Sequence, residues 1–220
     1  MILTVPPPLT IMPATHRFFD DLVTALASQA ALTAGYVTHA SGRAYRFLED
    51  STLRLGCLTR REGQSTLEVE VQPATLLTPL TMFAWPTRLD LKFEIVTEMG
   101  TAASPPSSYD AVGSPLDGIQ RMHANIIEHA FIAYYERHSD KINIARSKAG
   151  AGRLPTLAFA NVVRNAFAHG GIHFTGKKAG AEVSWGGLSY SERDNGRQIM
   201  YRDISQGDVI LLLLEMDGLF

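Results

Sequence analysis

The stretch Leu154–Gly171, LPTLAFANVVRNAFAHGG, is the segment from which the rest of the chain is best interpreted. Its apolar residues recur every three or four positions, which is the spacing of one buried helix face. They are Leu157, Ala160, Val163 and Phe167. Pro155 suits the first turn, where its missing N–H is not needed, and Gly170 and Gly171 favour the left-handed cap that ends many helices. The sequence therefore predicts a helix that stops at the glycine pair.

Three polar side chains, Arg164, Asn165 and His169, fall in the last turn and a half of this helix. Cations are favoured there by the macrodipole and the free carbonyl groups. Arg164 and His169 are five positions apart, which is about 140° around a regular helix. They share a face only if the end of the helix is distorted, so we expect this end to meet another surface.

The composition is that of an ordinary globular protein: 220 residues, 45% hydrophobic and 19% charged,. A formal net charge of −2 argues against a uniformly basic nucleic-acid surface, so any contact with RNA must come from a local patch,. Cys57 is the only cysteine, which excludes an internal disulfide and a multi-cysteine zinc site and fits a reducing compartment,.

No membrane segment is expected, because the longest apolar run, Val209–Leu214, is far shorter than the about 20 residues of a spanning helix,. The first residues also lack the basic end and apolar stretch of a signal peptide,. We therefore expect a cytoplasmic protein.

Residues 1–74 predict an α+β amino-terminal region of unknown role. Residues 1–14 carry four prolines and predict an extended arm that can lie on its own chain or on a partner,. A helix is expected over Thr15–Leu32, with Thr15 as its N-cap. Strands are expected over Gly35–Ala40, Arg43–Leu48, Leu53–Thr59 and Thr66–Gln72,.

Residues 75–220 predict a mainly α domain with a small β insertion. Leu89–Ile95 alternates like a strand but also fits a helical spacing that ends at Gly100, and we favour the helix,. Ile119–His138 has the clearest helical period in the chain,. Asp140–Arg153 is expected to form a flexible basic loop, and its cations are candidate RNA contacts. They are Lys141, Arg146, Lys148 and Arg153.

The carboxyl-terminal part predicts short strands followed by a last helix. The strand candidates are Ile172–Phe174, Val183–Trp185, Leu188–Tyr190 and Arg197–Tyr201, the last two joined across a turn at Asp194–Gly196,. Ser205 is expected to cap the last helix, with Asp208 at its third position and Gly218 at its end,.

The hexapeptide Arg164–His169 matches the R-N-x-x-x-H pattern, a form of R-x4-6-H, and so resembles the HEPN superfamily (higher eukaryotes and prokaryotes nucleotide-binding domains),. The neighbouring features are also similar: a long amphipathic helix before the motif, a glycine after the histidine and a closing helix. The resemblance covers roughly residues 87–220 and leaves residues 1–74 unexplained.

This resemblance implies a helical bundle that forms a homodimer, with the two motifs facing each other across a cleft. It also implies a metal-independent endoribonuclease without a cofactor, of the kind found in toxin–antitoxin and phage-defence systems, with RNA as substrate and an antitoxin as one kind of protein partner. By resemblance His169 is the acid/base catalyst, Arg164 holds the phosphate, and Asn165 orients a partner or binds substrate. A dimer would also bring together residues that one regular helix keeps apart.

Other interpretations remain open. Arg164 can simply pair with an acid while His169 caps its helix. The chain can be a non-catalytic HEPN module that binds a nucleotide, RNA or a protein, or a structural dimerisation protein whose motif is buried and satisfied. His169 and His173 are four positions apart, but the glycine pair should break the helix between them, so no metal site is expected,.

Overall fold

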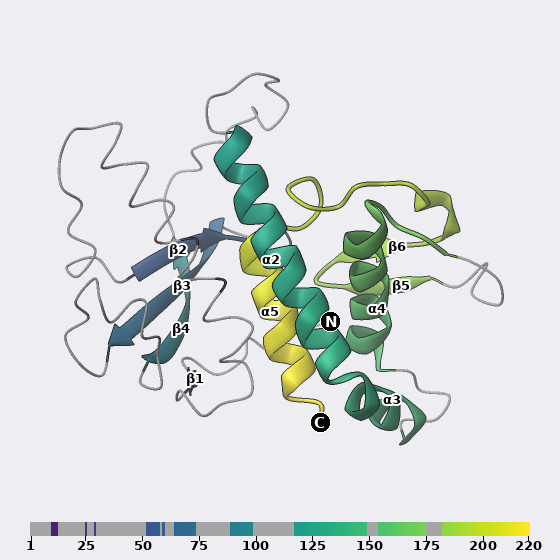
Figure 1. Ribbon diagram of the computed structural model, residues 1–220, viewed down its shortest axis with the longest axis horizontal. Coiled ribbons are helices and arrows are strands. Elements are labelled where there is room, and N and C mark those ends of the chain that lie inside the picture. The colour runs from purple at the N-terminus through teal and green to yellow at the C-terminus, as the bar shows by residue number, and fades with distance from the viewer. Residues whose placement is uncertain are drawn as a thin grey trace.

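The computed structural model describes residues 10–12, 25, 29, 52–57, 59, 64–73, 89–98, 117–148, 154–174 and 182–220. A sheet made from the first part of the chain lies on one side of a group of helices made from the second part (Figure 1). The strands of the sheet are β1 (Thr10–Met12), β2 (Thr52–Gly56), β3 (Gln64–Pro73) and β4 (Leu89–Glu98). The helices that follow are α2 (Asp117–Arg137), α3 (Ser139–Lys148), α4 (Pro155–His169) and α5 (Gln206–Asp217).

The sheet is antiparallel with strand order β1-β4-β3-β2. The strands predicted around residues 53–59 and 66–72 are confirmed as β2 and β3. The predicted arm contributes β1, which lies on its own chain by pairing with β4, with Ile11 opposite Lys92. The expected hairpin at residues 35–48 lies outside the described residues, and of the expected first helix only Ala25 and Gln29 are described, both helical and buried.

The helix favoured for Leu89–Ile95 is wrong, because this segment is strand β4. Its strict alternation of apolar and polar residues has the period of a strand, and ten consecutive residues pair with β3, from Leu89 opposite Pro73 to Glu98 opposite Gln64,. That pairing satisfies the backbone hydrogen bonds that a helix would have satisfied locally. The sheet therefore continues past residue 75, while the division into two domains stays a prediction.

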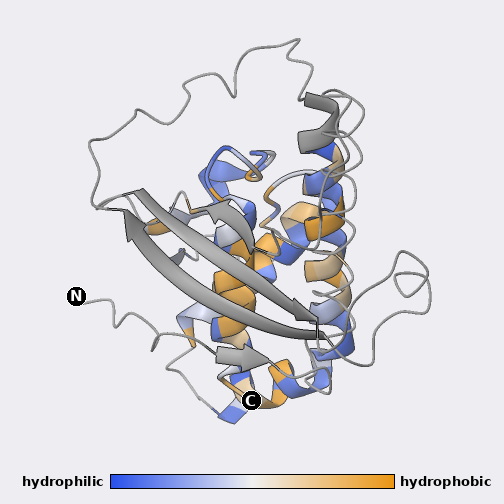
Figure 2. Ribbon diagram, turned by 90° about the vertical axis from the view of Figure 1, so that its left-hand side faces the viewer, coloured by the Kyte–Doolittle hydropathy of each residue, from blue (hydrophilic) through white to orange (hydrophobic). Residues whose placement is uncertain are grey.

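Helices α2, α4 and α5 pack against one another and form the core of the described residues. Figure 2 shows α5 at the centre of the molecule, coloured mostly as hydrophobic. Every residue from Val209 to Leu213 is buried, and a helix that is apolar on all sides is stable only when it is surrounded by other elements,. α2 and α4 cover α5 with Phe131, Tyr134, Leu157 and Val163.

The predicted start and end of α5 are confirmed. Ser205 is its N-cap, Asp208 completes a capping box and Gly218 is its C-cap. The Asp208 carboxylate is fully buried and also accepts hydrogen bonds from Thr59, from its N–H at 3.2 Å and from its hydroxyl at 2.5 Å. Thr59 follows strand β2, so this carboxylate joins the sheet side of the molecule to α5.

The flexible loop predicted for Asp140–Arg153 is wrong over most of its length, because Ser139–Lys148 is helix α3. The helix follows α2 directly, since the N–H of Ile142 donates to the carbonyl of His138 at 2.9 Å. Ile142 is completely buried and anchors the helix, while Asp140 at its start and Arg146 and Lys148 at its end match the helix dipole,. Arg153 lies outside the described residues.

The β insertion is smaller than predicted. β5 (Val183–Trp185) and β6 (Leu188–Tyr190) are confirmed and pair with each other. The strand predicted for Arg197–Tyr201 is wrong: only Met200 forms an isolated bridge, and Tyr201 has a φ of 59° that turns the chain,. A short 3-10 helix, η3 (Glu192–Asp194), precedes it. Ile172–Phe174 forms hydrogen bonds with residues 195–197 but is not a strand, so the strand predicted there is wrong.

From residue 117 onward, the described residues are mainly α-helical with one two-stranded sheet. This confirms the predicted mainly α class with a small β insertion. No helix among the described residues combines the length and the apolar character needed to cross a membrane.

Candidate active site at the end of α4

Helix α4 is regular through the whole motif. Pro155 lies in its first turn after an extended Leu154, and Gly170 takes the left-handed conformation, with φ 74°, as its C-cap,. The N–H of Gly171 donates to the carbonyl of Ala166 at 2.8 Å, which satisfies the end of the helix. Because nothing distorts this end, Arg164 and His169 point away from each other around the helix.

Arg164 faces α2. Its Nε donates to Oε1 of Glu136 at 2.6 Å, and its Nη2 forms an ion pair with the same oxygen. Its Nη1 donates to Oδ1 of Asn165 at 3.0 Å, so the two adjacent motif residues are held together. The side chains of Arg164 and Glu136 are 28% and 51% exposed, so the pair is accessible to solvent. The expectation that Arg164 could pair with an acid is thus confirmed.

A second cation lies beside this pair. Burial raises the pKa of the buried Tyr135, and the positive charges of Arg146 and Arg164 both oppose that rise. The hydroxyl of Tyr135 donates to Oδ1 of Asn161, one turn before Arg164 on α4, at 3.2 Å. Arg146 of α3 therefore lies near the motif, and its role as an RNA contact stays a prediction.

The other predicted substrate contacts are less closely connected to the motif. Lys141 and Lys148 are exposed on α3. α3 leads into the first turn of α4, whereas His169 lies in the last turn of that helix.

His169 is exposed in the last turn of α4, and its ring lies near that of His173, with centroids 6.1 Å apart. The glycine pair does end the helix between them, but the chain then turns so that both rings reach the same place. Among the described residues, no group of three or more histidine, cysteine or acidic side chains is arranged to hold a metal ion.

The segment that carries His173 is held by the loop that follows β6. The N–H of Ile172 donates to the carbonyl of Arg197 at 2.9 Å, and the N–H of Gly196 donates back to the carbonyl of Ile172 at 2.8 Å. Asn195 accepts from the N–H of Phe174 at 2.7 Å and donates to its carbonyl at 3.2 Å. Four hydrogen bonds thus fix the backbone on both sides of His173.

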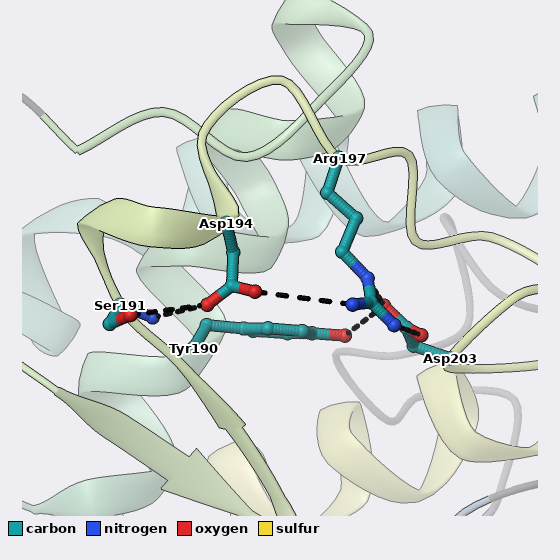
Figure 3. Close-up of polar contacts among 5 residues, drawn as sticks. All are labelled: Tyr190, Ser191, Asp194, Arg197 and Asp203. Atoms are coloured by element: carbon teal, nitrogen blue, oxygen red, sulfur yellow. Dashed lines mark hydrogen bonds and ion pairs between the residues drawn. The ribbon is translucent and has the colours of Figure 1, made fainter.

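Side chains in turn fix that loop (Figure 3). Arg197 binds both carboxylate oxygens of the buried Asp203, and Tyr190 donates to the same carboxylate at 3.2 Å. Asp194 accepts from the N–H of Ser191 at 2.8 Å and lies 4.0 Å from Arg197. The loop between Ser191 and Asp203 is therefore held in place by its own side chains. Its hydrogen bonds to Ile172 and Phe174 keep His173 beside the end of α4.

The sequence alone did not identify four residues of this region: Glu136, Tyr135, Asn161 and His173 as a neighbour of His169. Asn161 could have been found, because it precedes Arg164 and Asn165 by three and four positions and so shares their side of the helix. Glu136 is 28 positions from Arg164 and carries no local signal.

Comparison of the chain with family models, with curated proteins and with solved structures finds no match. Membership of the HEPN superfamily is therefore an inference from the motif and its position alone.

Proposed function

We propose that this protein is a HEPN-type, metal-independent endoribonuclease that acts in the cytoplasm as a homodimer. The observation that carries the proposal is the R-N-x-x-x-H motif at the end of a regular helix, with an exposed His169 and with the Arg164 guanidinium oriented by Asn165. A role as a toxin or phage-defence effector, with an antitoxin or other protein as partner, belongs to the same proposal.

The chemistry requires two functions that these side chains supply. Internal cleavage of RNA needs a group that takes the proton of the 2′-hydroxyl and a cation that stabilises the charge growing on the phosphate oxygens. An imidazole is suited to the first task at neutral pH, and the planar fork of a guanidinium to the second. His169 therefore transfers protons and Arg164 binds the phosphate.

A dimer accounts for the geometry of α4. Because the helix is undistorted, Arg164 and His169 of one chain diverge, whereas Arg164 of one protomer and His169 of its partner can converge on one phosphate if the two helix ends face each other. Arg146 of α3 lies near Arg164, Lys141 and Lys148 are exposed on the same helix as Arg146, and Arg153 follows them in sequence. They provide phosphate contacts along the RNA.

An RNA phosphate must compete with Glu136 for the guanidinium of Arg164. Its carboxylate occupies the guanidinium fork that a phosphate would use, but the pair is half exposed, and ion pairs of this kind contribute only about 0–1 kcal/mol,. Displacing Glu136 is therefore a small loss compared with a bidentate phosphate contact.

The test is cleavage of a panel of RNAs in the presence of a chelator by the wild-type protein, Arg164→Ala and His169→Ala. Arg121→Ala and His129→Ala, which remove exposed residues of α2, are the matched controls. We expect cleavage by the wild type and both controls and a loss of 100-fold or more in the two motif variants, about 3 kcal/mol of transition-state stabilisation. Absence of cleavage by the wild type over the whole panel would overturn the proposal.

A non-catalytic HEPN module that binds a nucleotide, RNA or protein is the second candidate, and the Glu136–Arg164 pair favours it. If Arg164 serves to hold α4 on α2, neither the wild type nor any variant will cleave RNA, and Arg164→Ala will lower only the stability of the protein. The same set of variants, compared in RNA-binding and unfolding experiments, separates the two functions.

A further inference from the structure

His169 and His173 form the only pair of exposed histidines whose rings adjoin in the described part of the chain, with centroids 6.1 Å apart. Within those residues neither imidazole has a hydrogen bond or an ion pair, so their nitrogens are available to a ligand. Arg164 differs in this respect, because its guanidinium is already bonded to Glu136 and Asn165.

The backbone that carries the two histidines is held in place. His169 is fixed by the regular end of α4, and His173 stands between two buried residues, Ile172 and Phe174, whose backbones are both bonded to the loop at residues 195–197. Gly171 packs so closely on this loop that a Cβ there would lie 2.9 Å from the carbonyl oxygen of Gly196. A fixed backbone limits the loss of conformational entropy on substrate binding to the two side chains.

We propose that His173 is a second proton-transfer residue and that it works with His169 of the same protomer; this rests on the proposed ribonuclease function. The cleavage step needs both a base and an acid. One neutral imidazole takes the proton of the ribose 2′-hydroxyl while O2′ forms its bond to phosphorus. The bond from phosphorus to O5′ breaks, and O5′ takes a proton from the second imidazole, which is cationic.

The products are a 2′,3′-cyclic phosphate and a 5′-hydroxyl end, and the step consumes no water, metal ion or oxidant. The base and the acid stand on opposite sides of the phosphorus, each within about 2.6–3.2 Å of its oxygen. The His169 and His173 rings adjoin, with centroids 6.1 Å apart, and both side chains are exposed, so their imidazoles can turn toward the two sides of one bound phosphate without a histidine from the partner. The partner then supplies only Arg164.

The experiment compares wild type, His169→Ala, His173→Ala and the control His129→Ala, with a chelator present. Each is assayed over a range of pH on an RNA oligonucleotide and on a uridine 3′-phosphodiester with a 4-nitrophenyl leaving group. Nitrophenolate leaves without a proton, so this substrate needs the base but not the acid. Because the side chain of His173 is exposed, the variant should fold, and a thermal melt checks this; His173→Gln serves as a second variant.

We expect the His173 variants to lower kcat/KM on RNA by 100-fold or more and to remove one limb of the bell-shaped pH profile. One of the two histidine variants, whichever lacks the acid, should recover activity on the nitrophenyl substrate. If wild type and His173→Ala cleave RNA equally with the same pH profile while His169→Ala is inactive, the role of His173 is refuted and the ribonuclease stands. If wild type cleaves neither substrate, both proposals fall.

Discussion

Replacement of Asp208 by asparagine tests the contact that joins the sheet side of the molecule to α5. The Asp208 carboxylate is completely buried, and among the described residues it accepts four hydrogen bonds: two from Ser205, through its N–H and its hydroxyl, both at 2.8 Å, and two from Thr59. Asparagine has nearly the same shape but only one oxygen, so its amide NH2 must face one pair of these donors.

The expected change in the free energy of unfolding follows from the hydrogen-bond donors that lose their acceptor in Asp208→Asn. On either side one hydroxyl and one backbone N–H are affected; the hydroxyl can rotate toward another acceptor, but the N–H cannot. A buried donor left without a partner costs about 1–3 kcal/mol, and a hydrogen bond to a charged group contributes about 1.5–3 kcal/mol. We therefore expect Asp208→Asn to reduce the free energy of unfolding by about 2–4 kcal/mol, a large fraction of the 5–15 kcal/mol typical of a domain.

Urea unfolding followed by far-UV circular dichroism measures this change as a shift of the midpoint at constant m-value. Thr59→Val is the matched control, since it removes one hydroxyl donor and leaves the carboxylate bonded, with an expected loss of about 1 kcal/mol. A loss in Asp208→Asn that is no larger than in Thr59→Val would show that the carboxylate is not the shared acceptor described above.

Three further predictions concern single contacts. Glu136→Gln should change the free energy of unfolding by less than about 1 kcal/mol, because the pair with Arg164 is half exposed, and should lower KM for RNA; a higher KM would mean that Glu136 positions the guanidinium,. Gly171→Ala should lower stability in urea unfolding by about 1–3 kcal/mol, because its Cβ would meet the backbone of Gly196, and an unchanged midpoint would contradict this close packing,. Burial raises the pKa of Tyr190 above its ordinary value of 10, so its neutral phenol contributes stability that is complete below about pH 10 and is lost as the pH rises further,. Stability measured between pH 9 and 11 should therefore fall less steeply in Tyr190→Phe than in the wild type, and equal slopes would count against the burial.

Elements with strong local signals were predicted from the sequence. α4 was bounded by Pro155 and Gly170, and α5 by the Ser205–Asp208 capping box, because proline, glycine and capping side chains act on the backbone next to them,. β3 was recognised by its alternation of apolar and polar residues,.

Elements whose structure depends on residues far away in the sequence were not predicted. Leu89–Ile95 alternates like a strand but also fits a helical spacing, and its pairing with β3 decides between the two. α3 (SDKINIARSK) is polar on most of its surface and is held by one buried side chain, Ile142, which its mostly polar composition conceals. The strand expected at Arg197–Tyr201 is replaced by a turn because Arg197 bonds to Asp203, six residues later.

In the candidate site, too, the residues with a local signal could be predicted and those brought in from distant segments could not. Arg164, Asn165 and His169 could be chosen from a short pattern, since they lie within six residues of one helix. Their environment could not, because Glu136 comes from α2 and His173 is brought close by a loop that is itself fixed by side chains of residues 190–203.

The composite site in a dimer is tested most directly by mixing two inactive variants, Arg164→Ala and His169→Ala, after separate purification and subunit exchange. In a mixed dimer one site receives Arg164 from one chain and His169 from the other and is intact. Random exchange makes about half of the dimers mixed, with one of two sites restored, so roughly a quarter of wild-type RNA cleavage should return. Cleavage that stays at the level of the separate variants, in a mixture shown by size and mass to contain mixed dimers, would contradict a site shared between chains.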